Sequence, residues 1–174
     1  LAGEIYDFVI DRLNSYYSEL EYSDQQFESS AYALPTSFSD FDRRLKAIGE
    51  FTKLPEAEAL AAANKRIRNI LKKAIADGVE IPATVDTARF LDDAERALHA
   101  VVEAAIADTD PLLAARDYVA VLGRLARLRP EVDTFFDKVM VNADDPAVRA
   151  NRFALLQRLA DRLGSVAAIE HLSV

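Results

Sequence analysis

Apolar residues recur at helical spacing along almost the whole chain. Within residues 3–21, side chains at intervals of three and four fall on one helix face; they are Ile5, Phe8, Val9, Leu13, Tyr16, Tyr17 and Leu20. Residues 22–37 are more polar and contain Pro35, which predicts a short helix followed by a loop. The apolar spacing then resumes and predicts a second long helix from near Ser39 to about Phe51.

Proline marks the start of four further predicted helices, because its missing N–H is not needed in a first turn. These prolines are Pro55, Pro111, Pro130 and Pro146. The helix after Pro55 is expected to end near Gly78, and the helix after Pro111 near Leu128. Between these two, another long helix is expected, capped by Thr84 or Asp86 and including Phe90.

The segment VEIPATVD at 79–86 is a weak strand candidate, and Pro82 argues against it because proline cannot donate to a sheet. The rest of the pattern shows no internal repeat and no linker. At 174 residues, of which 51% are hydrophobic, the chain suits one domain with a sizeable core. We therefore expect an all-α single domain over residues 1–174, a bundle of seven or eight helices.

Composition narrows the setting of this domain. The chain has no cysteine, which excludes disulfides and thiolate chemistry. It lacks an apolar run of the ~20 residues that span a bilayer and the basic-then-apolar start of a secretory signal. A cytoplasmic protein without membrane contact is expected. Because the sequence begins at Leu1 and not at methionine, we also expect a fragment of a longer chain.

Catalytic chemistry finds little support in the residue pattern. Glu95 and His99 stand four apart and could share a helix face, but carboxylate metal bundles repeat Glu-x-x-His on other helices. His171 is isolated, and there is neither a glycine-rich phosphate loop nor a nucleophile elbow. We expect no catalytic residue, no metal and no cofactor in this domain, and no enzyme activity by this chain alone.

The charges are distributed unevenly. The formal net charge is −8, yet residues 43–73 hold nine basic and three acidic side chains. Residues 1–42 hold one basic and nine acidic side chains, and residues 77–117 hold three and ten. A local basic face can bind nucleic acid even on an acidic protein, so residues 43–73 are the candidate.

Two interpretations of the basic stretch ALAAANKRIRNILKKA at 59–74 stay open. Its inward residues are expected to be Leu60, Ala63, Ile67, Ile70, Leu71 and Ala74; the outward ones are Lys65, Arg68, Asn69 and Lys72, with Arg66 and Lys73 on one flank. A helix dipole favours lysines in the last turn, so this could be an ordinary solvated face. Arg66 and Arg68 lie mid-helix without an acid three or four positions away. They need a partner outside the helix, either an acidic neighbouring helix or a phosphate backbone.

The last predicted helix carries arginine on its inner side. Arg149 and Arg152 project onto the same side as Leu156 and Leu159, near the positive end of the helix dipole. We expect a partly buried ion pair with a carboxylate of a neighbouring helix, with Asp137 or Asp145 as the candidate partner, and a structural role for both arginines.

Several segments resemble one protein family. LPEAEALAAANKRIRNIL (54–71) and FFDKVMVNADDPAVRANRFALLQRLADRL (135–163), with FVIDRLNSYY (8–17) and FDRRLKAI (41–48), are similar to the C-terminal region of bacterial glycyl-tRNA synthetase β subunits. The run at 148–156 also resembles the closing helix of DALR-type anticodon-binding domains, which arginyl-tRNA synthetases contain. Residues 22–40, with SDQQFESS, are more polar than that family leads us to expect.

The resemblance implies an all-helical anticodon-binding domain of an enzyme with two α and two β subunits. That enzyme joins glycine to its tRNA with ATP and Mg²⁺, at an active site outside this region. The implied partners are the anticodon stem-loop of tRNA(Gly), the α subunit and the remaining β-subunit domains, with neither DNA nor membrane. The alternative is a non-catalytic helical module whose basic stripe docks on an acidic surface of another synthetase domain.

The chemistry of this RNA suggests how it could be bound. Lys65, Arg68 and Lys72 are expected to contact phosphates of the anticodon stem, with Arg43, Arg44 and Arg66 as secondary candidates.

Glycine anticodons share two cytosines, whose N4 amino group an acidic side chain can read and whose acceptors Arg, Lys or Asn can read. Loop bases also stack on aromatic side chains. Tyr22, Phe27, Tyr32 and Phe38 are the candidates in the segment before residue 40.

Overall fold

The computed structural model describes residues 2–32 and 37–173, and within these ranges it contains helices and extended connections but no β-strand. Its eight α-helices in this part of the chain confirm the predicted all-α class. They are α1 (Ala2–Glu19), α2 (Asp24–Ala31), α3 (Phe38–Phe51), α4 (Ala57–Ala76), α5 (Asp93–Ala114), α6 (Tyr118–Ala126), α7 (Arg129–Lys138) and α8 (Pro146–Leu163); two 3-10 turns are η1 (Thr87–Arg89) and η2 (Ile169–Leu172).

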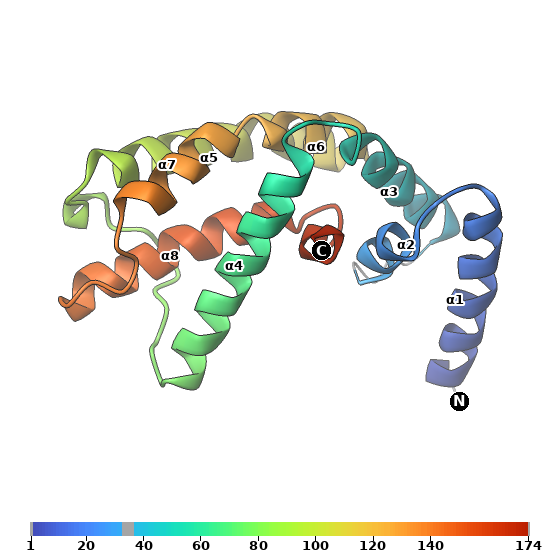
Figure 1. The fold of residues 1–174 in the computed structure, drawn as a ribbon, viewed down its shortest axis with the longest axis horizontal. Helices are drawn as coiled ribbons and strands as arrows, with labels where there is room; N and C mark the ends of the chain where they lie inside the picture. Colours follow the sequence, from blue (N-terminus) through green and yellow to red (C-terminus); the bar gives the residue numbers. More distant parts are fainter. Residues whose placement is uncertain (1, 33–36, 174) are drawn as a thin grey trace.

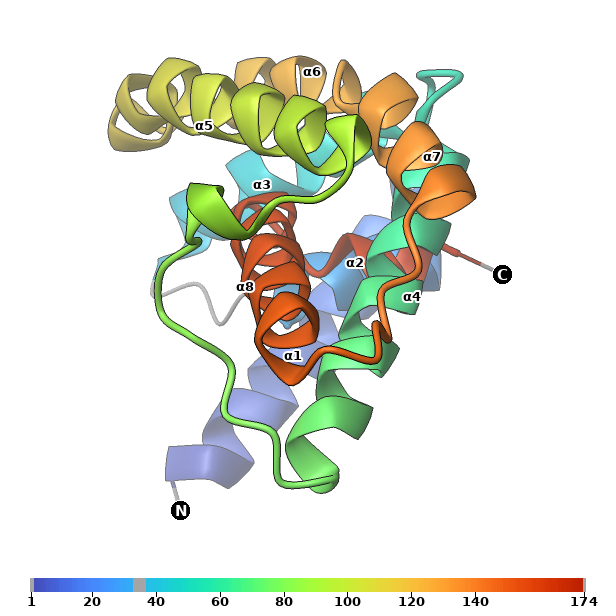
Figure 2. The ribbon, with the colours of Figure 1, turned by 90° about the vertical axis from the view of Figure 1, so that its left-hand side faces the viewer.

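The helices form two crossing layers with an N-terminal extension. Figure 1 shows α5, α6 and α7 above α4 and α8, with α1, α2 and α3 at the other end. α5 packs against α6, α7 and α8, while α4 packs against α8 and α3 against α6. In Figure 2, α8 lies between the long segment that follows α4 and the short segment that precedes α8.

The C-terminal turn η2 joins the two ends of the molecule, because it packs against both α4 and α2. The Ser29 hydroxyl on α2 donates to the Ala168 carbonyl at 2.9 Å. In return the Ala168 N–H donates to the Ser29 carbonyl at 3.0 Å. The segment 165–173 therefore fixes α2 to the main bundle.

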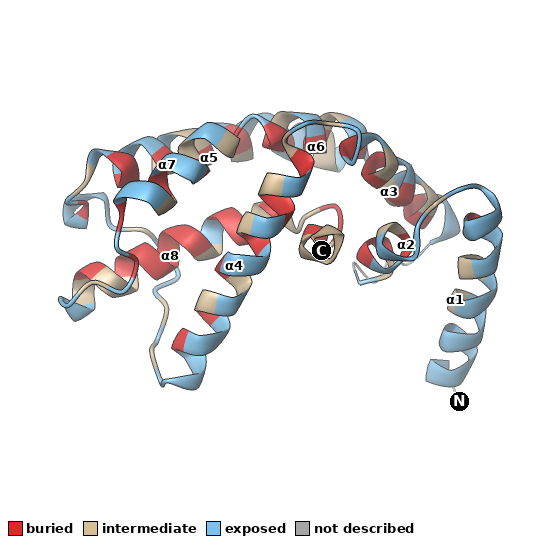
Figure 3. Ribbon diagram, in the orientation of Figure 1, coloured by how far each residue is buried: buried red, intermediate tan, exposed pale blue. Residues whose placement is uncertain are grey.

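The core consists of two apolar clusters. The larger one runs through α3 to α8 and η2, and α8 is buried on most sides, as Figure 3 shows. The predicted inner residues Leu156 and Leu159 are fully buried there, as is Leu155. The smaller cluster fastens α1 and α2 to α3 and consists of Tyr17, Phe27, Phe41 and Leu45. Apart from Tyr17, most residues of α1 are exposed.

Several predicted helix starts are confirmed. Pro130 and Pro146 lie in the first turns of α7 and α8. The Asp145 carboxylate accepts hydrogen bonds from the first free N–H groups of α8, and Gly164 ends that helix. The predicted short helix in 22–37 is α2, which begins with a capping box formed by Ser23 and Gln26. Pro35 lies outside the described residues.

The predicted start of the long central helix was wrong. Asp86 caps only the turn η1, and the helix α5 begins at Asp93. The reason is a tertiary contact: the Asn151 side chain accepts from the Asp86 N–H and donates to its carbonyl, which holds this segment extended against α8. Phe90 then has extended backbone (ψ 127°) and packs in the core.

The predicted helix start at Asp110-Pro111 was also wrong, because α5 continues through Pro111 to Ala114. A proline inside a helix leaves the carbonyl four residues earlier without its donor. Here that residue is Ala107, which is exposed, as is Pro111, so water can satisfy the carbonyl. The next helix, α6, begins at Tyr118 with Asp117 as its cap.

The segment 79–86 is extended connection and not a strand, as Pro82 indicated. Within the described ranges, the helices are too short or too polar to cross a bilayer.

Candidate nucleic-acid interface

One side of α4 forms an exposed basic surface. We call it the α4 basic face; its members are all exposed and are Lys65, Arg66, Asn69, Lys72 and Lys73. The opposite side of the helix is buried through Leu60, Ile67 and Leu71. This division follows from the helical period, because the apolar positions lie one above another and leave the cations on the solvent side.

The cations of this face have few internal partners. Neither Lys65 nor Lys72 forms an ion pair or side-chain hydrogen bond with another residue that the structure describes. Lys73 lies 3.2 Å from the Asp77 carboxylate, but both side chains are exposed. Exposed pairs of this kind contribute roughly 0–1 kcal/mol, so Lys73 is also available to a stronger partner.

Arg66 has an aromatic partner. Its guanidinium lies over the ring of Phe136 on α7, with its Cζ 4.3 Å from the ring centroid. A cation–π contact orients the guanidinium plane and leaves its charge uncompensated. Arg66 is exposed, so its charge and N–H groups face solvent from a fixed position. The sequence pattern indicated that Arg66 needs an external partner but did not identify Phe136.

Arg68 does not belong to this face, although the helical spacing predicted that it would. Unlike the exposed members of the face, Arg68 is half-buried. Its Nη2 donates to the Ala160 carbonyl of α8 at 3.0 Å. Its Nε lies 3.9 Å from a carboxylate oxygen of Glu170 in η2. A Cβ on Gly164 would lie 2.8 Å from the Arg68 Nη2. The guanidinium therefore occupies space that a glycine leaves open.

Arg44 is likewise bound inside the protein. Its guanidinium donates to the Ser165 and Val166 carbonyls at 3.0 and 2.6 Å and to the Asp40 carboxylate at 2.8 Å. It also lies over the Tyr118 ring. This places Arg44 at the junction of α3, α6 and the C-terminal segment, where four of its five N–H donors are already used, the fourth by the Tyr118 hydroxyl.

Of the six predicted RNA contacts, the structure therefore brings Lys65, Arg66 and Lys72 together on one surface. Arg43 is exposed but lies on α3, a different helix. Its proposed role remains a prediction.

A shallow hollow of about 500 Å³ accompanies the α4 basic face. Its lining residues are Ala62, Lys65, Arg66, Asn69, Ile70, Lys73 and Ser173. Ser173 comes from the C-terminal segment, which the sequence pattern gave no reason to place beside α4. The hollow combines three cations, an amide and an apolar floor, which is chemistry suited to a phosphate and sugar.

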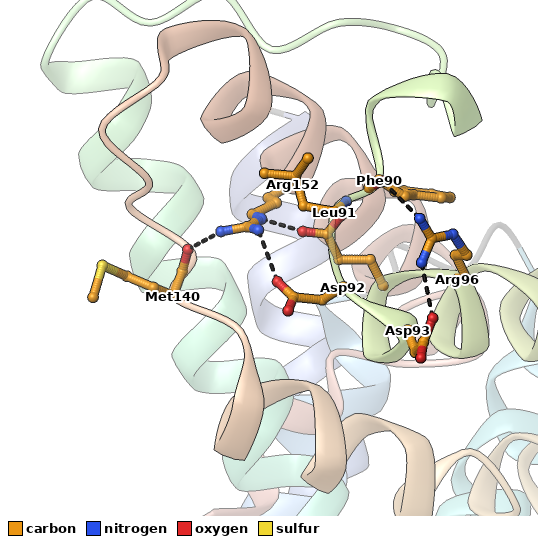
Figure 4. A network of polar contacts seen from close by, with 8 residues as sticks. Phe90, Leu91, Asp92, Asp93, Arg96, Met140 and Arg152 are labelled. Atoms are coloured by element: carbon orange, nitrogen blue, oxygen red, sulfur yellow. Dashed lines mark hydrogen bonds and ion pairs between the residues drawn. The ribbon is translucent and has the colours of Figure 1, made fainter.

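Arg152 forms the predicted buried ion pair, but with different partners from those predicted. Figure 4 shows its guanidinium pointing at the Met140 carbonyl and at Asp92. The buried Glu95 carboxylate accepts a further hydrogen bond, from the Arg152 Nε. Asp137 and Asp145 are not its partners, because the start of α5, and not α7, lies against this side of α8.

Arg149, the other arginine on that side, donates to the Ala143 carbonyl at 3.2 Å. Glu95 is thus engaged by Arg152 and does not pair with His99. Among the described residues, the structure contains no group of His, Cys, Asp and Glu suited to hold a metal ion.

The four candidate stacking residues have different environments. Phe27 is buried and Tyr22 is half-buried, so neither offers a free ring face. Phe38 and Tyr32 are exposed. The Tyr32 ring stacks on His171 of η2, with centroids 4.3 Å apart and planes 19° apart.

Comparison with known proteins agrees with this arrangement. The sequence model of the DALR anticodon binding domain matches residues 60–169. The glycine–tRNA ligase β subunit of Xanthomonas campestris pv. campestris (strain B100) is 62% identical over 173 residues, which are 99% of this chain and 24% of that protein.

The β subunit of Xylella fastidiosa (strain M12) is 54% identical over 98% of this chain and 23% of its own length. The β subunit of Pseudomonas aeruginosa (strain LESB58) is 49% identical over 97% of this chain and 24% of its own length. The chain thus spans about a quarter of the length of the curated relatives it matches.

The family match begins in α4, at Leu60, and ends in η2, at Ile169. It therefore includes the α4 basic face, the Arg152 ion pairs and the Ser165 and Val166 carbonyls that Arg44 binds. Because the match covers more than half of the chain, this chain belongs to the family of DALR anticodon binding domains.

Proposed function

We propose that this chain binds the anticodon arm of tRNA(Gly) and positions that tRNA for ATP-dependent attachment of glycine at an active site outside the chain. Membership of an anticodon-binding family supports the RNA ligand. Similarity to β subunits of glycine–tRNA ligase supports the glycine specificity and the role in aminoacylation. The α subunit and the remaining β-subunit domains are the proposed protein partners.

The observation that carries this proposal is the α4 basic face. Lys65 and Lys72 are seven residues apart, about two helical turns or roughly 10 Å along the axis. Arg66 lies between them on the flank, held by Phe136. In a protein of net charge −8, phosphates are attracted only where cations lack acidic neighbours, and Lys65 and Lys72 meet that condition.

A titration with a tRNA(Gly) anticodon stem-loop at several salt concentrations tests the proposal. The double variant Lys65→Glu/Lys72→Glu should bind much more weakly, and its log Kd should depend less steeply on log salt. Each lost phosphate contact lowers that slope by roughly 0.7 to 0.9. The control Lys138→Glu/Arg127→Glu makes the same charge change at the end of α7 and beside α6, at two exposed cations that form no ion pair with a described residue.

The control should retain most of the affinity and the salt slope. If the α4 variant and the control bind alike, the assignment of RNA to this face is wrong. A second stem-loop, in which uracils replace the two anticodon cytosines, tests sequence specificity. Equal binding to both stem-loops would mean that the chain holds RNA without reading the anticodon.

A second candidate function is contact with other parts of the synthetase, and α1 favours it. Ile5 and Phe8 on α1 are 58% and 60% exposed, which is unusual for large apolar side chains. The double variant Ile5→Ser/Phe8→Ser should weaken association with the purified α subunit or with the rest of the β subunit. Unchanged association would exclude α1 as that contact.

A further inference from the structure

A second hollow, of about 400 Å³, lies between α1 and α2. Its lining residues are Ile10, Asp11, Asn14, Phe27, Glu28, Ala31 and Tyr32. Its volume is within the range of about 300–1,000 Å³ of small-molecule pockets, and it has an apolar floor with polar groups at its edge. Figure 1 shows α2 between α1 and the C-terminal segment, so this hollow and η2 lie on opposite sides of α2.

Tyr32 supplies a fixed aromatic wall to this hollow. It is the most exposed aromatic residue among those described, at 63%. One face of its ring is covered by the parallel His171 ring of η2. Tyr32 also lines the hollow. A planar ligand that met the uncovered face of this ring would extend the stack.

Asp11 and Asn14 supply unused polar groups on the opposite wall. They are three residues apart on α1 and so lie on the same side of the helix. Neither side chain forms a hydrogen bond or ion pair with another described residue. The Asp11 carboxylate is an acceptor only, whereas the Asn14 amide can both donate and accept.

We propose that this hollow receives one unstacked cytosine of the anticodon loop, an inference that rests on the proposed function. Tyr32 stacks on the base, Asp11 accepts from the N4 amino group, and the Asn14 amide donates to N3 or O2. Uracil has an acceptor at position 4, where Asp11 would repel it, so the pocket selects cytosine. Base-specific contacts of this kind use the edges that the two pyrimidines do not share.

The pocket connects to the α4 basic face through η2. His171 stacks on Tyr32, and Ser173, two residues later, lines the hollow beside Lys65 and Arg66. Two residues of extended chain span at most about 7 Å, so His171, which backs the Tyr32 ring, and Ser173, which lines the other hollow, are near neighbours. The C-terminal segment thus contacts one wall of each hollow.

The test measures the affinity of the chain for the tRNA(Gly) stem-loop and for the stem-loop with uracils in place of the two cytosines. Tyr32→Ala should lower affinity for the first at least fivefold, the lower end of what the loss of one base–aromatic stack produces. Tyr32→Phe keeps the ring and should remain within twofold of the original chain. Asp11→Asn should reduce the preference for cytosine over uracil, because an amide can donate to the uracil acceptor.

Two exposed residues of α1 provide matched controls. Tyr16→Ala removes an exposed ring, and Asp7→Asn removes a carboxylate one turn before Asp11; neither residue lines the hollow. Both controls should leave affinity and base preference unchanged. Thermal melting of every variant confirms that each is folded at the temperature of the titration.

The outcomes separate the two proposals. If Tyr32→Ala and Asp11→Asn bind like the original chain while Lys65→Glu/Lys72→Glu loses affinity, the pocket is wrong and the proposed function stands. If Tyr16→Ala loses as much affinity as Tyr32→Ala, the pocket is also wrong. If the unchanged chain fails to bind either stem-loop, the proposed function fails and the pocket with it.

Discussion

Arg152 on α8 and Glu95 on α5 form an ion pair from which water is almost completely excluded, with 6% and 0% of their side chains exposed. The Asp92 carboxylate and the Met140 carbonyl complete the acceptors of the guanidinium. Bringing these charges out of water is costly, and only the full set of contacts offsets that cost. The pair thereby fixes how α8 lies against the start of α5.

We expect Arg152→Ala to destabilise the protein by about 3–5 kcal/mol, because it leaves the buried Glu95 carboxylate without its cation, with only the hydrogen bond from the Leu91 N–H. Urea unfolding followed by circular dichroism measures this free energy. Arg158→Ala is the matched control on the same helix, since Arg158 pairs with Glu103 and both side chains are about 40% exposed. The control should cost roughly 1 kcal/mol or less. Equal losses would mean that burial of the Arg152 pair does not determine its importance.

The Asp40 carboxyl should make stability depend on acid pH. Burial raises its pKa, but hydrogen bonds from Tyr118 and Arg44 outweigh burial and hold the pKa below the ordinary 3.8. A carboxyl with a lower pKa in the folded state stabilises that state above its unfolded pKa. This stabilisation disappears as the pH falls through the folded value.

The free energy of unfolding should therefore fall more steeply below about pH 4 in the original chain than in Asp40→Asn. Urea titrations between pH 7 and pH 3 provide both curves. Glu103 also has a lowered pKa, caused mainly by its hydrogen bond from Arg158. Its contribution to the pH dependence of stability should be the same in both proteins. Parallel curves would show that Asp40 is not the group responsible.

Arg44 should hold the segment 165–173 in place. Arg44→Ala removes its hydrogen bonds to the Ser165 and Val166 carbonyls and should cost about 2–3 kcal/mol. Amide hydrogen exchange should speed up in residues 165–172 before it does so in α5. Arg43→Ala, one position earlier and exposed, should remain within about 0.5 kcal/mol of the original chain. Unchanged exchange in Arg44→Ala would contradict this role.

Two cations of α4 should separate stability from RNA binding. Arg68→Ala loses the bond to the Ala160 carbonyl and should lower stability by roughly 1–2 kcal/mol with little effect on stem-loop affinity. Lys72→Ala should do the opposite, since Lys72 is exposed and contacts no described residue through its charge. Melting temperature and stem-loop affinity, measured on both variants, decide between the roles. A loss of affinity in Arg68→Ala without a loss of stability would place Arg68 on the RNA.

Local chemistry predicted the features of the fold that depend on neighbouring residues. The start of α8 at Pro146 follows from the sequence around it, as does the burial of Leu156 and Leu159. The start of α5 could not be predicted in this way. It depends on the contact of Asp86 with Asn151, which is 65 positions away in the sequence.

The candidate site shows the same limit. Helical spacing correctly placed Lys65 and Lys72 on the solvent side of α4, because that side is defined by the apolar residues of the helix itself. It could not separate Arg68 from them, since Arg68 is held by the Ala160 carbonyl of α8, which is 92 positions later in the sequence. Tyr32 was one of four candidate stacking residues, but its contact with His171 and the contact of Phe136 with Arg66 could not be predicted, because both form where separate elements meet.

The reciprocal bonds between Ser29 and Ala168 join residues 139 positions apart, which sets an order on folding during synthesis. A ribosome that adds 5–20 residues per second needs on the order of ten seconds to travel from one to the other. During that time α1, α2 and α3 can form their own small cluster, but the side of α2 that receives η2 remains uncovered. This side of α2 therefore lacks its partner until residues 165–173 have emerged from the ribosome.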